Sequence, residues 1–329
     1  MKQLFEKLYT HNLLSEEEAC TLLLRFAAGG LNPSQLSSLL SVYNMRSPSV
    51  AELAGFRRAM LEVCLVPDID ASAAIDIVGT GGDGKNTFNI STLSAVVVAA
   101  AGIPVVKHGN YASGSVSGSS NVLEHLGYTF TSNNALLQQQ LEQHKLCFLH
   151  APFFHPAMKH AAVVRKELGV RSFFNLLGPV INPARPGARL LGVSRLSMVK
   201  LYQCLPGDEQ TRCHIVHALD GYDELSLTGK FKLVTLDAEQ VLTPRDIGFE
   251  TIAPATLYGG DSVAAAAKVF TGVLSGDCLP EQRQVVIANS GLAIHCARPE
   301  IPPDICFGIA KESLMSGAAY RLFKQIIKT

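Results

Sequence analysis

Residues 79–92 read GTGGDGKNTFNIST, and this glycine-rich stretch decides the predicted fold. It follows the short apolar run AIDIV, which is typical of a buried strand, and precedes an apolar run from Leu93 that has helical spacing. A glycine loop between a strand and a helix offers free backbone N–H groups and the positive end of a helix dipole to a phosphate. The stretch therefore predicts a strand–loop–helix unit that holds a phosphate.

Two familiar motifs overlap in this loop, and neither is complete. The dinucleotide fingerprint G-x-G-x-x-G needs an acidic residue near the end of the next strand, but that strand ends in Lys107 and His108. The P-loop motif needs a hydroxyl after its lysine, but Asn86 follows Lys85. Four glycines in six residues still favour a phosphate site over a tight turn without a ligand.

A second loop of the same kind follows the next strand. Residues 107–121 read KHGNYASGSVSGSSN and combine a lysine at the strand end, three glycines, several serines and a helix start at about Ser119. This composition predicts a second anion site, because a flexible surface loop would not need Lys-His-Gly-Asn at a strand end. Two such loops on successive strands indicate a ligand with separated phosphates.

The rest of the chain divides into two parts. Capping boxes at Ser15/Glu18 and Ser49/Glu52, with an apolar stripe through Leu36 and Tyr43, predict helices over the first seventy residues. From Ala74 onward, short apolar strands alternate with helical stretches, which implies a mainly parallel sheet. We expect a small all-helical N-terminal domain over residues 1–72 and a larger α/β domain over 73–329, in which helices flank the sheet.

Later segments follow the same alternation. RLLGV and CHIVHAL are predicted strands, HPAMKHAAVVRKELG is predicted to start a helix at Pro156, and residues 305–328 are predicted to form one helix. His214 and His217 stand three apart on a predicted strand, where their side chains point to opposite faces. We interpret them as structural residues and not as a metal-binding pair.

Composition excludes several classes of protein. The 329 residues contain 28 Lys and Arg against 28 Asp and Glu, and this balance argues against a nucleic-acid or membrane-surface protein. The start of the chain lacks a secretory pattern, and the longest apolar run, residues 95–106, is too short to cross a bilayer. Eight cysteines without a C-x-x-C pair are typical of reduced thiols, so we expect a cytoplasmic protein.

Four longer stretches carry a resemblance to a known family. They are the glycine loop, KHGN at 107–110, HPAMKHAAVVRKELGVRSFFNLLGPVINPA at 155–184 and DGYDELSLTG at 220–229. Together, in this order, they closely resemble the anthranilate phosphoribosyltransferase family over most of the chain. The resemblance implies the nucleoside phosphorylase type II fold class, an active site between the domains and a homodimer. It also implies that a segment near 165–190 joins the helical domain.

The activity implied by the resemblance is transfer of the phosphoribosyl group of 5-phosphoribosyl 1-pyrophosphate to the amine of anthranilate. The products are N-(5-phosphoribosyl)anthranilate and pyrophosphate, a step in tryptophan biosynthesis. The leaving pyrophosphate gains negative charge, so a cation on it, Mg²⁺ in this family, lowers the barrier. Two alternatives remain: a pyrimidine nucleoside phosphorylase of the same fold and a non-catalytic paralogue that binds nucleic acid.

The resemblance also implies a role for individual residues. Asp223 and Glu224 are implied metal carboxylates with the Ser91 hydroxyl as a further ligand, and His108 is a candidate for orienting the substrate or accepting a proton. Residues implied to contact anthranilate are Gly79, Asn110, His155 and Arg165, whose planar fork suits a carboxylate. Residues implied to bind the donor are Gly79, Gly82, Asp83, Thr87, Asn89, Ile90, Ser91, Thr92, Lys107, Gly109, Ser115 and Ser119.

The second loop departs from the usual family pattern at three positions. Tyr111 stands where arginine is usual, Gly114 where serine is usual, and Asn121 where aspartate is usual. We expect these changes to alter local phosphate contacts and not the reaction, because backbone amides and the remaining serines still face an anion.

Overall fold

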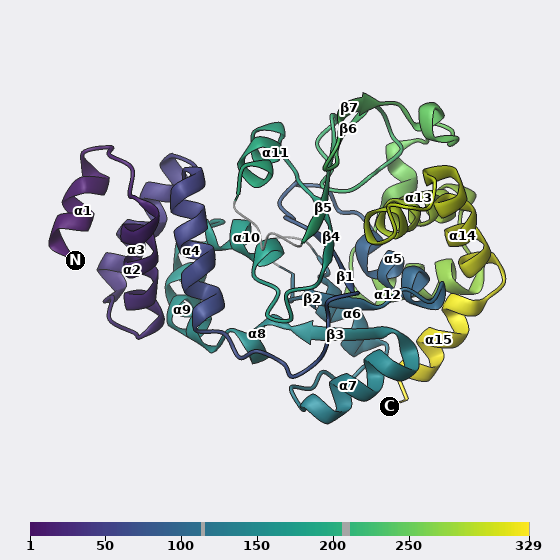
Figure 1. Ribbon diagram of the computed structural model, residues 1–329, viewed down its shortest axis with the longest axis horizontal. Helices are drawn as coiled ribbons and strands as arrows, with labels where there is room; N and C mark the ends of the chain where they lie inside the picture. The colour runs from purple at the N-terminus through teal and green to yellow at the C-terminus, as the bar shows by residue number, and fades with distance from the viewer. Residues whose placement is uncertain (113–115, 206–210, 329) are drawn as a thin grey trace.

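The N-terminal part of the chain forms a layer of four helices, at the left of Figure 1. The computed structural model describes residues 1–112, 116–205 and 211–328. The four helices are α1 (Lys2–Tyr9), α2 (Glu16–Ala27), α3 (Pro33–Met45) and α4 (Val50–Glu62). Ser15 and Glu18 form the predicted capping box at the start of α2, and Ser49 and Glu52 form the one at the start of α4. The predicted helical start is therefore confirmed.

A seven-stranded sheet forms the centre of the molecule, in the order β3-β2-β1-β4-β5-β6-β7. The strands are β1 (Ile75–Gly79), β2 (Val105–Gly109), β3 (Leu146–His150), β4 (Ala188–Gly192), β5 (Arg212–Ala218), β6 (Phe231–Val234) and β7 (Glu239–Leu242). Strands β1 to β5 pair in parallel, whereas β6 and β7 add antiparallel strands at one edge. The prediction of a mainly parallel sheet is confirmed, but the antiparallel pair was not predicted.

The order of the strands places a ligand site beside β1. The chain runs outward from β1 through β2 to β3 and then returns to β4 on the other side of β1. Gly79 at the end of β1 is in register with Gly192 at the end of β4. In parallel sheets, ligands bind outside the carboxyl ends of the strands where the strand order reverses. The glycine loop leaves the sheet at this point.

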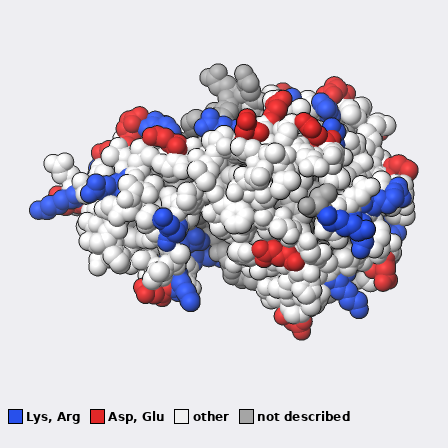
Figure 2. All heavy atoms as spheres, turned by 90° about the horizontal axis from the view of Figure 1, so that it is seen from below, with Lys and Arg blue, Asp and Glu red and all other residues white. Residues whose placement is uncertain are grey.

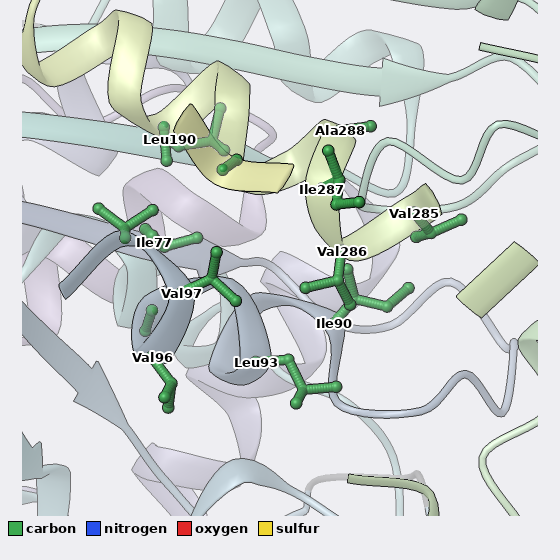
Figure 3. Packing of buried hydrophobic residues seen from close by; sticks show 14 of the residues in the cluster. Ile77, Ile90, Leu93, Val96, Val97, Leu190, Val285, Val286, Ile287 and Ala288 are labelled. Atoms are coloured by element: carbon green, nitrogen blue, oxygen red, sulfur yellow. The ribbon is translucent and has the colours of Figure 1, made fainter. Parts of the chain in front are cut away.

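Helices cover the sheet face that lies away from the N-terminal layer (Figure 1). They are α5 (Ile90–Ala100), α12 (Val263–Ser275), α13 (Pro280–Ala297), α14 (Pro303–Met315) and α15 (Ala318–Ile326). Figure 3 shows Val97 of α5 between Ile77 of β1 and Val286 of α13, in a buried cluster that also contains Leu93 and Leu190. This packing fixes α5, and with it the helix start that follows the glycine loop.

Two predictions about helices need correction. The predicted helix over 305–328 is two helices, because Gly317 adopts a left-handed φ of +76° between α14 and α15. The helix predicted to start at Pro156 begins as a 3₁₀ turn over Pro156–Met158, and α9 itself spans Lys159–Leu168. Helix α13 was missed, because it is buried on nearly all sides and so lacks an amphipathic stripe.

The segment after α9 packs against the N-terminal helices. The Phe173 ring lies 4.8 Å from Phe56 and 5.1 Å from Tyr43, and the Phe174 ring lies 5.1 Å from Phe26. Residues 173–181 thus share a hydrophobic core with α1 to α4. The division of the chain into domains at residue 72, with a return near 165–190, stays a prediction.

Short elements complete the chain and link the layers. They are α6 (Ser119–His125), α7 (Asn134–His144), α8 (Ala151–Phe154), α10 (Phe174–Leu177), α11 (Leu196–Gln203) and the 3₁₀ turns Gly178–Val180, Pro244–Ile247 and Pro254–Leu257. Gly127, with a φ of +97°, follows α6 and ends it as predicted.

One buried carboxylate ties the N-terminal helices together. The Glu52 side chain is fully buried and accepts hydrogen bonds of 2.6–3.0 Å from Arg46, Tyr43 and the main-chain N–H groups of Leu14 and Ser49. Burial alone would raise the pKa of Glu52, but the bonds from Arg46, Ser49, Leu14 and Tyr43 hold it below its ordinary value. The ionised form is therefore the one that the fold stabilises.

We predict that Glu52→Ala lowers the free energy of unfolding by about 3–5 kcal/mol, because it leaves Arg46 without its buried partner. Since the folded-state pKa is depressed, the contribution of Glu52 is present at neutral pH. It is lost as the pH falls below the unfolded value of about 4.3 and through the folded pKa. Urea denaturation at several pH values measures both effects. The control is Glu62→Ala on the exposed side of α4, and equal destabilisation by the two variants at pH 7 would refute the prediction.

Candidate active site

A cavity of about 810 Å³ opens at the carboxyl ends of β1 and β2, between the sheet and the segment that packs on the N-terminal helices. The glycine loop, the second loop and residues of 151–181 line it, together with Asp223 and Glu224. The cavity brings together most of the predicted site residues: Gly79, Gly82, Asp83, Thr87, Asn89, Ser91, Thr92, Lys107, His108, Gly109, Asn110, Ser119, His155, Arg165, Asp223 and Glu224.

Two predicted donor-binding residues stand apart from this set. The Ile90 side chain is buried in the core between the sheet and α13, and does not line the cavity. Any contact of Ile90 with a ligand in the cavity would therefore have to come from its main chain. Ser115, like Gly114, lies outside the residues that the structure describes.

The backbone of the glycine loop has dihedral angles that residues with a side chain rarely adopt. Gly81, Gly82 and Gly84 have φ values of +63°, +86° and +72°, in the left-handed region that glycine adopts without strain. Between them, Asp83 accepts a hydrogen bond of 2.9 Å from the Lys85 N–H. The Lys85 ammonium lies 4.7 Å above the Tyr222 ring, which joins this loop to the loop that carries Asp223.

Asp223 is buried and Glu224 is half-buried at the start of the glycine loop. Asp223 Oδ2 accepts a hydrogen bond of 2.6 Å from Gly81 N–H, and Glu224 Oε1 accepts one of 2.9 Å from Ser91 N–H. A Cβ atom at Gly79 would collide with Asp223 Oδ2, and a Cβ atom at Gly192 would collide with the Asp223 carbonyl oxygen. The two glycines at the ends of β1 and β4 therefore allow Asp223 to reach its position.

These carboxylates stand close to one another with little compensating charge. Burial, followed by the nearby Asp83 carboxylate, raises the pKa of Asp223 to about 7. Burial and the charge of Asp223 raise the pKa of Glu224 well above its ordinary value. Two neighbouring acidic groups whose ionised forms are disfavoured fit a site for a divalent cation, since the cation would stabilise both charges.

The donor set here is all oxygen, which is the preference of Mg²⁺. Within residues 1–112, 116–205 and 211–328, no group of three or more His, Cys, Asp or Glu side chains is arranged to hold a metal ion. Mg²⁺ usually keeps several waters and binds through one or two carboxylates plus substrate phosphates. The residues present therefore fit Mg²⁺ bound together with a phosphate-bearing ligand.

Lys107 brings a positive charge to the same place. Its buried ammonium donates a hydrogen bond to the Ile77 carbonyl and lies 3.4 Å from Ser91 Oγ. Burial lowers the pKa of Lys107, and the charges of Asp76, Glu224 and Asp223 oppose that shift. Lys107, in the middle of β2, is thus held by Ile77 and Ser91, while the neighbouring carboxylates favour its charged form.

Two buried histidines line the other side of the cavity. His108 Nδ1 lies 3.2 Å from the Gly178 carbonyl and His155 Nε2 lies 3.0 Å from the Ile181 carbonyl, so each of these nitrogens donates. The second nitrogens, His108 Nε2 and His155 Nδ1, have no hydrogen-bond partner in the described part of the chain. Burial lowers the pKa of His108 to about 4 and that of His155 to about 3. Both rings are therefore neutral and each keeps a free lone pair.

An interaction that the sequence did not reveal holds this wall in place. Asn182 Nδ2 donates hydrogen bonds of 2.9 Å to Asp76 Oδ2 and to the Val106 carbonyl, and Asp76 Oδ1 accepts one of 3.3 Å from the His108 N–H. Asp76 and Asn182 are both buried. A carboxylate in the middle of the apolar strand AIDIV was the available signal, because a buried charge needs a partner elsewhere in the fold.

Arg165 lies at the far side of the cavity on α9. Its guanidinium donates a hydrogen bond of 3.4 Å to Asn175 Oδ1 and lies 5.8 Å from the Phe174 ring. Burial lowers the pKa of Arg165, but a guanidinium stays protonated in proteins. The same segment contributes Lys159 and Arg171 to the cavity wall, and sequence reasoning missed both cations.

The second loop is organised around the residues that depart from the family pattern. Asn121 Oδ1 accepts hydrogen bonds of 2.9 Å from Ala112 N–H and 3.0 Å from Gly118 N–H. The Tyr111 hydroxyl donates to Glu124 at 2.8 Å, and its ring lies edge-on to His150. Asn121 thus shapes the loop as an acceptor without adding negative charge, while Tyr111 points to α6.

The two histidines of β5 have different surroundings. The His214 ring lies 5.4 Å from His295 of α13, whereas His217 Nδ1 is 2.7 Å from the Val193 carbonyl. Both side chains are buried, and burial followed by His295 lowers the pKa of His214 to about 4. These separate contacts agree with a structural interpretation.

Comparison with known proteins places the chain in a family. Two family models match: "Glycosyl transferase family, helical bundle domain" over residues 2–64 and "Glycosyl transferase family, a/b domain" over residues 71–320. The anthranilate phosphoribosyltransferase of Cytophaga hutchinsonii is 50% identical over 328 residues, which cover 100% of both chains. This chain belongs to the anthranilate phosphoribosyltransferase family. The enzyme of that name from Bacteroides fragilis is 47% identical and is aligned over 100% of this chain and 99% of its own length.

Solved structures of the family share the fold. Anthranilate phosphoribosyltransferase from Thermus thermophilus superposes with a TM-score of 0.89 at 34% identity, covering 99% of this chain and 98% of that one. The enzyme from Saccharomyces cerevisiae, solved in complex with PRPP and Mg, has a TM-score of 0.89 at 27% identity. The superposition covers 99% of this chain and 96% of that one. The fold class predicted from the sequence is therefore confirmed.

We predict that the His108 and His155 rings stay neutral well below the ordinary histidine pKa of about 6.5. Because their folded-state pKa values are lowered by burial, stability is full above the unfolded value and declines as the pH falls toward 4. An NMR titration of the ring protons, assigned with His108→Gln and His155→Gln, measures this. The exposed His160 serves as the reference ring, and a titration of His108 near pH 6.5 would contradict the burial argument.

Proposed function

We propose that this chain transfers the phosphoribosyl group of 5-phosphoribosyl 1-pyrophosphate to the amine of anthranilate. The products are N-(5-phosphoribosyl)anthranilate and pyrophosphate, a step in tryptophan biosynthesis. The observation that carries this proposal is that one cavity is lined by Asp223, Glu224, the two predicted anion loops and Arg165. The names of the relatives and the yeast complex with PRPP and Mg support the same reaction.

The donor would lie along the two loops at the carboxyl ends of β1 and β2. The left-handed glycines at 81, 82 and 84 let backbone N–H groups approach a phosphate closely, and Lys107 adds a positive charge between the loops. The donor carries a 5-phosphate at one end and a pyrophosphate at the other, which matches two separate anion sites. The proposed donor-binding set is the one predicted from the sequence, with Ile90 acting through its main chain.

Asp223, Glu224 and the Ser91 hydroxyl would hold Mg²⁺ beside the pyrophosphate. When bound, the ion would neutralise negative charge that develops on the leaving group. The hydrogen bonds from the Gly81 and Ser91 N–H groups hold one oxygen of each carboxylate in place before any ligand binds. Such pre-oriented charges contribute more in a buried site than in water.

Anthranilate would lie between helix α9 and the side of the cavity that His108 and His155 line. The Arg165 guanidinium can pair with its carboxylate in two places, and Asn110 and Gly79 line the same cavity. As the amine nitrogen bonds to the anomeric carbon and the bond to pyrophosphate breaks, the nitrogen must release a proton. His108 lines the cavity with a neutral ring and is the candidate for accepting that proton, but its unpaired Nε2 is buried and would reach the cavity only after the ring turns.

The alternatives fit the structure less well. A paralogue that binds nucleic acid would need a basic face, but Figure 2 shows Lys and Arg interspersed with Asp and Glu on the face in view. Such a paralogue would also have no use for Asp223 and Glu224. A pyrimidine nucleoside phosphorylase of the same fold would not need the long motif with Arg165 at its centre. No helix of the described residues is long and apolar enough to cross a membrane.

The test of the function is release of pyrophosphate, measured with and without anthranilate and with and without Mg²⁺. We expect release only when both are present, and a loss of nearly all turnover in the variant with Asp223→Asn and Glu224→Gln. Circular dichroism of that variant should match wild type, because both substitutions keep the size of the side chain. Full activity of the double variant in excess chelator would refute the metal assignment.

Arg165→Ala should weaken the use of anthranilate far more than the use of the donor, because only the acceptor loses a charged partner. The loss of such a hydrogen bond costs about 1.5–3 kcal/mol, so we expect KM for anthranilate to rise at least tenfold. Steady-state kinetics for each substrate measure this, with Lys166→Ala, an exposed neighbour on α9, as the control. Equal effects on both substrates would show that the assignment is wrong.

We also propose a homodimer that forms through the N-terminal helices. The exposed apolar side chains of this layer support it: Met45 is 82% exposed, Tyr9 55% and Leu13 54%. Sedimentation should give twice the chain mass, and Met45→Glu with Leu13→Glu should shift the equilibrium toward monomer. A monomeric wild type at high protein concentration would contradict this proposal.

A further inference from the structure

An arginine from the helical side of the cleft reaches the glycine loop. Arg171 follows α9, whose end is marked by Gly169 with a φ of +62°. Its guanidinium occupies the space beside Gly82: a Cβ atom built on Gly82 would collide with Nη1 and come within 3.1 Å of Cζ. Arg171 thus bridges two walls of the cavity that come from distant parts of the sequence.

The position of Arg171 is tied to that of Arg165. Asn175 Oδ1 accepts hydrogen bonds from the Arg165 guanidinium at 3.4 Å and from Ser172 N–H at 3.3 Å. The turn that starts directly after Arg171 is therefore connected to the residue proposed to bind the acceptor. Phe173 and Phe174 anchor the same turn in the N-terminal core.

The charge of Arg171 has no protein partner that would explain its position. Within the described residues, Arg171 makes no ion pair with an Asp or Glu side chain, although it lies against the loop that contains Asp83. The side chain is exposed to the cavity. The Arg171 guanidinium lies against Gly82 and is not paired with a carboxylate. It can therefore pair with an anion that binds on the glycine loop.

We propose that Arg171 is a donor-binding residue that pairs with the pyrophosphate of the donor on the glycine loop. Gly81 and Gly79 of this loop contact Asp223, so the phosphate next to Gly82 is the one beside the metal carboxylates. The planar guanidinium binds phosphate oxygens in two places, which an ammonium cannot do. Gly82 has no Cβ and a φ of +86°, which leaves room for this approach. The inference rests on the proposed function.

The test compares Arg171→Ala and Arg171→Lys with Arg321→Ala, an exposed arginine of α15 that does not line the cavity. Calorimetry measures the affinity for pyrophosphate in the presence of Mg²⁺, and kinetics give KM for donor and acceptor separately. We expect Arg171→Ala to weaken pyrophosphate binding and raise the donor KM about 10- to 100-fold, the loss of one charged hydrogen-bonded pair. Arg171→Lys should restore only part of the affinity, and Arg321→Ala should bind pyrophosphate as wild type does.

Unchanged pyrophosphate affinity and donor KM in a folded Arg171→Ala variant would overturn the proposal, as would a rise confined to the anthranilate KM. A structural role alone would lower the unfolding temperature without a donor-specific effect, and this too would overturn it. The binding measurement needs no turnover. If wild type fails to use anthranilate but Arg171→Ala still loses pyrophosphate affinity, the proposed function fails while the role of Arg171 stands.

Discussion

The close contact between Asp223 and the ends of β1 and β4 is the constraint on which the rest of the site depends. Gly79 and Gly192 end these neighbouring strands in register, and neither position has room for a Cβ atom beside Asp223. This contact brings a loop that follows β5 onto the switch point of the sheet. The hydrogen bond from Gly81 to Asp223 then fixes the path of the glycine loop. The phosphate site and the carboxylates are therefore parts of one packing arrangement.

The same arrangement brings together ionisable side chains whose charged forms are destabilised by their surroundings. Asp223 and Glu224 lie near Asp83, and desolvation together with mutual repulsion raises the pKa of both carboxyl groups. Lys107 is buried near both carboxylates, and burial lowers its pKa as well. Perturbed groups of this kind cluster at functional sites, where a charged ligand completes the balance. We infer that the donor and Mg²⁺ supply the missing charges.

Sequence patterns correctly predicted the features of the fold that depend on interactions between residues close together in the chain. The capping boxes at Ser15 and Ser49 and the glycine loop depend on residues close together in the chain, and the structure has them where the patterns placed them. The strand predicted to end at Lys107 and His108 continues to Gly109. The prediction of Asp223, Glu224 and Arg165 as site residues needed the family resemblance, because DGYDE alone is more typical of a solvated turn.

Features that depend on distant contacts were not accessible to sequence patterns. Helix α13 is apolar on most sides because it is enclosed, so no amphipathic period marks it. The bond between Asp76 and Asn182 joins residues 106 positions apart, and the approach of Arg171 to Gly82 joins segments from two sides of the cleft. The break at Gly317 had a local signal, a glycine within a helical pattern, but a glycine there is also compatible with a continuous helix.

The most direct test of the central claim is the Mg²⁺-dependent affinity for pyrophosphate of Gly192→Ala, measured by calorimetry. Gly192 does not line the cavity, so its substitution acts on binding indirectly, through the shift of the Asp223–Glu224 main chain that a Cβ atom would force. Gly308→Ala in α14, where a Cβ atom would meet nothing within 4 Å, is the matched control. The account predicts that folded Gly192→Ala binds pyrophosphate with Mg²⁺ at least tenfold more weakly than wild type, while Gly308→Ala binds it equally well. Wild-type affinity in folded Gly192→Ala would contradict the account.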